Sequence, residues 1–157
     1  MIIDSTQLNM VRESNIGASI GYASGVFDLF HRGHINYIEE CKKNCDILII
    51  GVDSNRLAKQ RKGHARPMHD ISERMNNVSR HAHYVFAKDA PSECYTGTLC
   101  PNFYFFSKDN LIEPEKRRRL AENPNFKDAV FISYTNDIST TEILDNFAGG
   151  SIKRIGK

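Results

Sequence analysis

Two patterns of hydrophobic residues alternate along the chain. One is a short apolar run, typical of a buried strand, and the other is the helical spacing of an amphipathic helix. Residues 46–52 form a continuous apolar run between polar residues, which predicts a buried strand of a parallel sheet. Just before it, residues 34–44 place Ile35 and Ile38 on one face and most charged residues on the other, which predicts an amphipathic helix. With a strand of small residues at 19–25, these segments make a β-α-β unit.

The same alternation continues through the rest of the chain. Three further strands are predicted at 83–87, 103–106 and 129–133. Four further helices are predicted at 70–80, 92–99, 113–123 and 140–147. Alternating strands and helices predict the α/β class, with one doubly wound parallel sheet that binds its ligands at the carboxyl ends of the strands.

A length of 157 residues is most economically one domain. Residues 1–17 are polar and weakly periodic, so we expect an N-terminal extension or a short helix there. The domain is expected to occupy residues 18–148, and the glycine-containing, basic residues 149–157 are expected to be a tail.

Composition narrows the classes of partner. The net charge of +2 is too small to indicate a nucleic-acid surface. The longest apolar run is far too short to cross a bilayer and no secretory signal is visible, so we expect a cytoplasmic protein that binds no membrane. The four cysteines are expected to be free thiols. Because Cys41 and Cys45 are poorly spaced from His31 and His34 for a zinc site, no metal-binding residues are predicted.

Residues 25–34 carry the strongest chemical signal. This stretch reads Gly-Val-Phe-Asp-Leu-Phe-His-Arg-Gly-His and places His31 and His34 between a predicted strand and a predicted helix. A helix N-terminus presents free N–H groups and the positive end of the helix dipole, which suits a phosphate. Two imidazoles there could hold a phosphate whose charge grows in a transition state. The simpler alternative is a surface turn with two unrelated histidines.

Two further stretches could bind anions. Residues 59–67 are basic, and although a charge run is ordinarily a solvated loop, this one follows a predicted strand and is therefore expected to be a loop at the binding edge. Residues 138–143 begin the last predicted helix, with Ser139 at its N-cap and Glu142 three residues later, the pattern of a capping box. An ordinary N-cap is the alternative for this second stretch.

The pattern G-x-F-D-x-x-H-x-G-H in residues 25–34 resembles the cytidylyltransferase-like nucleotidyltransferases. The basic stretch resembles the family's Lys-Gly…Arg-Pro loop followed by Glu-Arg, and residues 138–141 resemble its Ile-Ser-Thr-Thr helix start. The resemblance implies a Rossmann-like nucleotidyltransferase fold. It also implies that the histidines contact the α- and β-phosphates of a nucleoside triphosphate. Basic residues would embrace the triphosphate and the substrate phosphate, and hydroxyl groups would bind the β- and γ-phosphates.

Carried over position by position, the resemblance gives a set of site residues, in which Asp28 is expected to hold the turn. The implied catalytic residues are His31, His34, Lys59 and Arg74. The implied nucleotide-binding residues are Gly25, Val26, Phe27, Gly33, Lys62, Asp109, Ser139, Thr140 and Thr141. The chain departs from the family pattern at Tyr134, where relatives that handle glycerol and choline phosphates often have arginine. It departs again at Ser107 and Lys108, which replace the glycines of a turn that ends at Asp109.

The resemblance implies attack of a substrate phosphate on the α-phosphorus of CTP or ATP, with release of pyrophosphate and with Mg²⁺ bridging the triphosphate oxygens. Two enzyme types fit equally, an adenylyltransferase for a heptose 1-phosphate and a cytidylyltransferase for glycerol 3-phosphate or a similar polyol phosphate. The departures motivate an alternative, a regulatory module that binds nucleotide without catalysis. A phosphopantetheine or nicotinamide-mononucleotide adenylyltransferase is a more remote alternative. Small members of the family are commonly dimeric, so a homodimer is expected, with the apolar residues 94–106 as its candidate surface.

Overall fold

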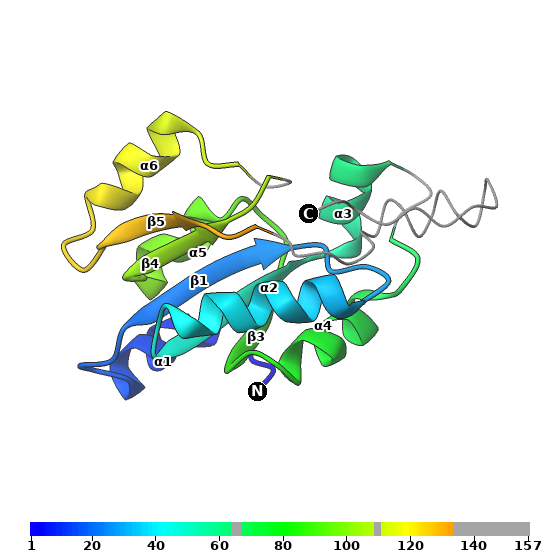
Figure 1. The fold of residues 1–157 in the computed structure, drawn as a ribbon, viewed down its shortest axis with the longest axis horizontal. Coiled ribbons are helices and arrows are strands. Elements are labelled where there is room, and N and C mark those ends of the chain that lie inside the picture. Colours follow the sequence, from blue (N-terminus) through cyan, green and yellow to red (C-terminus); the bar gives the residue numbers. More distant parts are fainter. Residues whose placement is uncertain (64–66, 109–110, 134–157) are drawn as a thin grey trace.

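The computed structural model describes residues 1–63, 67–108 and 111–133. Within these residues, five parallel strands form one sheet in the order β3-β2-β1-β4-β5 (Figure 1). The strands are β1 (Ile20–Gly25), β2 (Ile47–Asp53), β3 (Tyr84–Lys88), β4 (Phe103–Phe106) and β5 (Asp128–Phe131). Strand order reverses between β1 and β4, which confirms the predicted doubly wound α/β sheet and its Rossmann-like fold.

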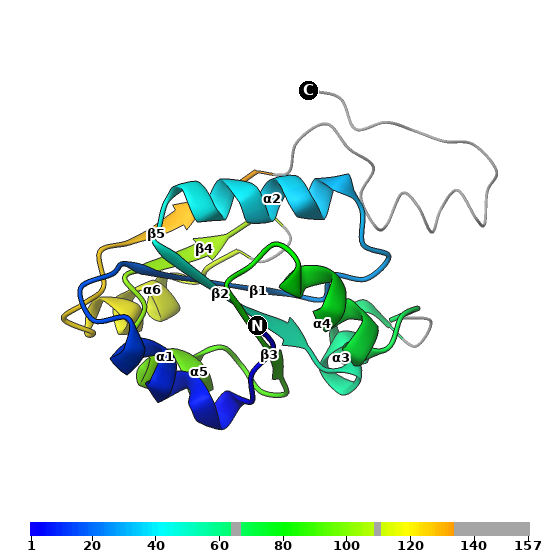
Figure 2. The same cartoon turned by 90° about the horizontal axis from the view of Figure 1, so that it is seen from below.

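Helices cover both faces of this sheet. They are α1 (Leu8–Ser14), α2 (Arg32–Lys43), α3 (Asn55–Lys62), α4 (Ile71–Ser79), α5 (Glu93–Leu99) and α6 (Pro114–Ala121), with a 3₁₀ turn η1 (Ser5–Gln7) before α1. Figure 2 shows α2 on one face and α1, α5 and α6 on the other. Successive strand residues point to opposite faces, so Leu48 and Ile50 join the apolar cluster beneath α2, while Ile49 joins the cluster beneath α1. The near-continuous apolar run of β2 is therefore buried on both faces.

The strands and helices predicted within the described residues all form, with bounds that differ by two residues or fewer. One element was not predicted. Residues 55–62 form helix α3, so the expected loop was wrong for residues 59–62, while residues 64–66 lie outside the described residues. Ser54 caps the helix by accepting a hydrogen bond from the N–H of Leu57. The residues between Ser54 and Gly63 are mostly good helix formers, and Gly63 ends the helix at a φ of 95°.

The N-terminal residues pack on the sheet. Asp4 caps η1, and helix α1 buries Leu8 and Val11 in the core, so the interpretation as a short helix is confirmed. The guanidinium of Arg12 donates hydrogen bonds to the carbonyl oxygens of Leu99 and Cys100, which ties α1 to the end of α5. These contacts explain why a polar segment with weak periodicity forms a helix here.

Much of the apolar area that made residues 94–106 a candidate dimer surface is already buried within the chain, although Cys94 is exposed and Tyr95 and Phe103 are half-buried. Leu99, Tyr104, Phe105 and Phe106 all belong to the core. The amine of Lys116, from α6, lies 4.8 Å from the centre of the Tyr104 ring, on the face of the sheet that α6 covers. Helices on both faces of the sheet therefore cover apolar side chains for which the sequence showed no partner.

All four cysteines are free, as expected. Burial raises the pKa of the Cys45 thiol to about 11, and it raises the pKa of Cys41 further, so both stay protonated at neutral pH.

Among the helices that the structure describes, none combines the length and apolar character that a membrane crossing requires. The last predicted helix, at 140–147, and the tail lie outside the described residues.

Gly21 has no space for a side chain. A Cβ there would overlap the ring of Phe105 and would lie 2.7 Å from the sulfur of Cys45. We expect Gly21→Ala to lower the free energy of unfolding by about 1–3 kcal/mol through overpacking. Equilibrium unfolding in urea measures the change.

Gly97 provides the matched control. A Cβ at this position in α5 would meet no heavy atom within 4 Å. We expect Gly97→Ala to raise the free energy of unfolding by about 0.5–1 kcal/mol, since alanine is the better helix former. A Gly21→Ala protein as stable as the parent would show that the strand has room to move at this point.

Candidate active site

The paired histidines lie where β1 ends, beside the point at which strand order reverses. His31 is the N-cap of α2, with extended backbone at a φ of −142°. Its Nδ1 accepts a hydrogen bond from the N–H of Gly33 at 3.0 Å, and Nδ1 of His34 accepts one from the N–H of His31 at 3.2 Å. The two side chains thus form a reciprocal capping box in which imidazoles replace the usual hydroxyl and carboxylate.

This cap selects one form of each imidazole. A nitrogen that accepts a hydrogen bond carries no proton, so Nδ1 of each ring is the unprotonated nitrogen. The proton of each neutral ring therefore lies on Nε2. The arrangement prepares both rings to act as hydrogen-bond donors through Nε2 while Nδ1 holds the first turn of α2.

Aromatic side chains hold the second histidine. His34 is only 6% exposed. Its ring lies 5.3 Å from the ring of Phe30, nearly parallel at 14°, and 5.6 Å from the ring of Phe27. The His31 ring lies 4.0 Å from His34 on the same turn. The backbone that makes this arrangement is strained, because Phe27 and Leu29 have φ angles of 54° and 49° in the left-handed region.

Asp28 compensates for that strain. Its buried carboxylate accepts hydrogen bonds from the backbone N–H groups of Met68 at 2.7 Å and His69 at 2.9 Å. It therefore joins the histidine turn to the segment that precedes α4. This geometry agrees with the expectation that Asp28 holds the turn.

Arg74 is fully buried, with 0% of its surface exposed. Its guanidinium donates to the carbonyl oxygens of Val26 at 2.8 Å, Asp53 at 2.7 Å and His69 at 3.0 Å. A further bond reaches the side chain of Asn55 at 2.8 Å. Burial lowers the pKa of Arg74, and the nearby carboxylates, Asp28 first, act in the opposite direction. These contacts lock together the ends of β1 and β2 and the start of α4.

A buried ion cluster at the ends of β2 and β3 was not predicted. The Asp53 carboxylate, 0% exposed, accepts from Lys88 at 3.0 Å and from Arg61 at 2.7 Å. Lys88 is itself buried, and Arg61 comes from α3. The only sequence signal was a charged residue at the end of each apolar strand, Asp53 after 47–52 and Lys88 after 84–87. That signal does not say that the two charges meet.

The structure brings part of the predicted set together. Gly25, Val26, Phe27, His31, Gly33, His34 and Arg74 gather at the carboxyl end of β1 and the start of α2. Lys59 and Lys62 lie exposed on the last turn of α3, the helix that follows β2. Asp109, Ser139, Thr140 and Thr141 lie outside the described residues.

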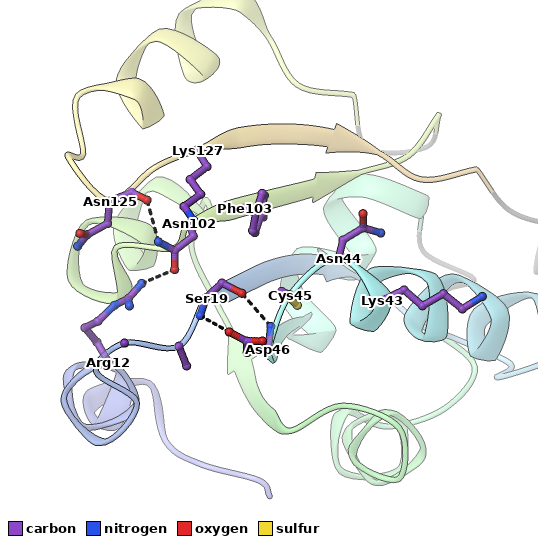
Figure 3. Close-up of a pocket in the computed structure, with 12 residues that line it drawn as sticks. Arg12, Ser19, Lys43, Asn44, Cys45, Asp46, Asn102, Phe103, Asn125 and Lys127 are labelled. Atoms are coloured by element: carbon purple, nitrogen blue, oxygen red, sulfur yellow. Dashed lines mark hydrogen bonds between the residues drawn. The ribbon is translucent and has the colours of Figure 1, made fainter.

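A polar hollow of about 560 Å³ lies at the opposite edge of the sheet, where β1, β2 and β4 begin (Figure 3). Its groups largely bond to one another. Ser19 and Asp46 exchange two hydrogen bonds, and Asn102 accepts from Arg12 and donates to the carbonyl oxygen of Asn125. This hollow lies at the opposite end of the strands from the histidine turn. The hydrogen bonds around it join the segments that lead into the strands.

Comparison with known proteins decides the family. A model of the cytidylyltransferase-like family matches residues 22–146, which include the histidine turn and the Ser-Thr-Thr positions. The chain belongs to the cytidylyltransferase-like family. The predicted resemblance is therefore confirmed, and with it the membership of a nucleotidyltransferase family.

Curated relatives match across most of this domain. The bifunctional protein HldE of Paramagnetospirillum magneticum is 29% identical over 137 residues, which is 85% of this chain and 28% of the relative. HldE of Actinobacillus pleuropneumoniae serotype 5b is 30% identical over 133 residues, which is 82% of this chain and 27% of the relative. The chain thus spans little more than a quarter of the length of these relatives.

Solved structures share the fold. A lipopolysaccharide core biosynthesis protein from Thermoplasma volcanium superposes with a TM-score of 0.67 at 22% identity, covering 76% of this chain and all of that one. A pantoate-beta-alanine ligase from Francisella tularensis superposes with a TM-score of 0.56 at 14% identity, covering 92% of this chain and 75% of that one. At these identities the likeness concerns the fold alone.

Replacing Arg74 tests the lock that it forms. We expect Arg74→Lys to lower the free energy of unfolding by about 3 kcal/mol, because one ammonium cannot satisfy carbonyls that point from three segments. Urea unfolding measures the loss.

Arg118→Lys is the control, since Arg118 is exposed on α6 and, among the described residues, pairs only with Glu115 and Glu122. We expect that variant to change stability by less than about 0.5 kcal/mol. Equal stability losses in the two variants would contradict the role of Arg74.

Proposed function

We propose that this chain transfers a nucleotidyl group from ATP or CTP to a sugar or polyol phosphate and releases pyrophosphate. The observation that carries the proposal is the reciprocal cap of His31 and His34 on α2, placed at the switch point of a doubly wound sheet. Ligands of such sheets bind at this point, and family membership supports a nucleotide there.

In the proposed reaction, an oxygen of the substrate phosphate attacks the α-phosphorus in line with the departing pyrophosphate. The bond from the α-phosphorus to the bridging oxygen breaks as the new P–O bond forms, so no covalent enzyme intermediate is required. Negative charge shifts toward the bridging oxygen and the pyrophosphate. The Nε2–H groups of His31 and His34 and the N-terminus of α2 would stabilise that charge more strongly in the transition state than in the ground state.

The remaining predicted residues would act in several different ways. Arg74 would act as a positioning residue, because its guanidinium is engaged by the backbone around the histidine turn. Lys59 and Lys62 would contact phosphate oxygens, since they are exposed cations on the helix that follows β2. Gly33 would allow the backbone to approach the phosphates closely. Asp109, Ser139, Thr140 and Thr141 remain proposed nucleotide-binding residues.

Mg²⁺ would enter this site on the triphosphate. Two buried carboxylates at this end of the sheet are already paired, Asp28 with two backbone N–H groups and Asp53 with Lys88 and Arg61. Mg²⁺ commonly keeps most of its waters and binds through substrate phosphates, and its chemistry would be charge neutralisation on the triphosphate oxygens.

The identity of the two substrates is open to a direct assay. Purified protein is mixed with each of four nucleoside triphosphates and a panel that includes a heptose 1-phosphate and glycerol 3-phosphate, and pyrophosphate release is followed. We expect one donor and one acceptor class to be turned over. Nucleotide binding without pyrophosphate from any pair would favour the regulatory module, which the departures at Ser107, Lys108 and Tyr134 motivate.

Two properties accompany this proposal. We propose a cytoplasmic location, because the substrates are soluble metabolites. We also propose a homodimer, as is common among small family members, and the measurement is sedimentation at micromolar concentrations, where a species of 17.9 kDa throughout would exclude it.

His34→Gln separates catalysis from folding. Glutamine can accept the hydrogen bond from the His31 N–H, as it does in ordinary capping boxes, but it has no imidazole. We expect kcat to fall by about 10²- to 10³-fold while nucleotide affinity changes only a few-fold. Steady-state kinetics and calorimetric nucleotide binding measure the two effects. Lys127→Ala, at the opposite edge of the sheet, is the control, and parental turnover by His34→Gln would rule out the assigned role.

Nucleotide binding should also order the basic end of α3. We expect saturating nucleotide to slow amide hydrogen exchange at residues 58–63, because cations that pair with phosphate would stop the last turn from fraying. Residues 71–79 should change less, since Arg74 already fixes the start of α4. Exchange at 58–63 that is the same with and without bound nucleotide would exclude Lys59 and Lys62 from the site.

A further inference from the structure

Four rings from three segments are linked by three successive ring contacts. His31 contacts His34 at a centroid distance of 4.0 Å, and His34 stacks on Phe30 at 5.3 Å. Phe30 stacks in turn on His81, at 5.8 Å and 25°. The first three rings belong to the turn and the first residues of α2, whereas His81 follows α4 in the chain.

The outer ring is anchored independently of the histidine turn. The N–H of His81 donates to the carbonyl oxygen of Val78 in the last turn of α4, and Val78 is a fully buried core residue. Nδ1 of His81 lies 3.8 Å from the carboxylate of Glu39 on α2, and Glu39 also faces Lys42. His81 is therefore held at the junction of α4 and α2, with its ring face against Phe30.

The cap alone leaves one freedom of His34 undetermined. The torsion between Cβ and an imidazole ring has broad, shallow minima, so the capping hydrogen bond of 3.2 Å to Nδ1 does not by itself fix the plane of the ring. A parallel ring on its face does fix that plane, because stacked aromatic pairs have a preferred geometry. Phe30 is itself held by the apolar cluster beneath α2 and by the stacked ring of His81.

We propose that His81 is a positioning residue for His34 and that it acts through Phe30. This inference rests on the proposed function for its kinetic consequence, although the contact itself does not. His81 holds Phe30 flat against His34, and the His34 ring then presents Nε2–H in the direction that the phosphate requires. Displacement of a catalytic group by about 1 Å can cost roughly a hundredfold in rate, so a partial loss of this support should have a smaller but measurable effect.

Three variants distinguish the effect of the His81 ring from the effect of charge at this position. His81→Leu removes the aromatic face but keeps apolar volume, and His81→Phe restores the ring without a titratable group. Glu39→Gln removes the neighbouring carboxylate charge and leaves the His81 ring in place. If His81→Leu does not fold, His81→Gln replaces it as the variant that lacks a ring.

The first readout is independent of enzymatic activity. Histidine side-chain resonances of the full chain are recorded by NMR, and the His34 signals are assigned from their absence in His34→Gln. We expect His81→Leu to move the His34 signals toward those of a free imidazole, because the ring-current effect of Phe30 on His34 weakens. His81→Phe and Glu39→Gln should leave the His34 signals near their parental positions.

The second readout is kinetic, with the donor and acceptor found by the pyrophosphate assay. We expect His81→Leu to lower kcat about tenfold with KM for both substrates changed less than about twofold, and His81→Phe to restore kcat. Unmoved His34 signals in His81→Leu, or a His81→Phe protein as impaired as His81→Leu, would overturn the proposal. An effect of Glu39→Gln as large as that of His81→Leu would also overturn it, in favour of an electrostatic role. If no pair of substrates is turned over, the proposed function fails while the NMR comparison still decides the contact.

Discussion

The described site depends on one buried guanidinium. Arg74 donates to the carbonyl oxygens of Val26 and Asp53, which lie just past the end of β1 and at the end of β2, and to that of His69 before α4. Beyond the ends of strands the backbone has no ladder partner, and a buried carbonyl without a donor costs free energy. The planar arginine fork can satisfy carbonyls from several directions, which a lysine cannot. The shape of the edge that would meet a phosphate is therefore set by a residue with no exposed surface.

The histidine turn is built on that support. Two non-glycine residues, Phe27 and Leu29, adopt left-handed backbone angles within it, a conformation that persists only when surrounding contacts hold it. Asp28, between them, supplies such contacts through two backbone N–H groups of the segment before α4. The chain then enters α2 through a cap made of imidazoles. The same Nδ1 atoms that cap the helix also fix which nitrogen of each ring carries its proton. The hydrogen bonds that begin α2 therefore also set the tautomer of both imidazoles.

Charge is distributed unequally between acids and bases at this edge. The buried carboxylate of Asp53 is compensated by Lys88 and Arg61, and Asp28 is compensated by backbone donors. Lys59 and Lys62 remain exposed nearby on α3. Asp28 and Asp53 are thus both paired within the protein, while Lys59 and Lys62 face solvent. At the opposite edge, Asp46 and Ser19 bond to each other around the polar hollow, and no comparable turn is present among the described residues there.

The sequence by itself determined the α/β class, the described strands to within two residues, and the histidine turn. Short apolar runs, helical patterns and the spacing of the two histidines are local properties that the sequence shows directly. It did not determine that Arg74 is buried or that Asp53 meets Lys88, since those contacts join residues 21 to 48 positions apart. It misjudged residues 59–62, where charge suggested a loop although Ser54 and Gly63 delimit helix α3. It also did not show that Leu99, Tyr104 and Phe105 are already buried within the chain. Only the tertiary structure decided which charged groups are buried and paired inside the protein and which face solvent. A charged side chain becomes buried and paired when segments that are distant in sequence come together in the fold. A local pattern does not show which distant segment that will be.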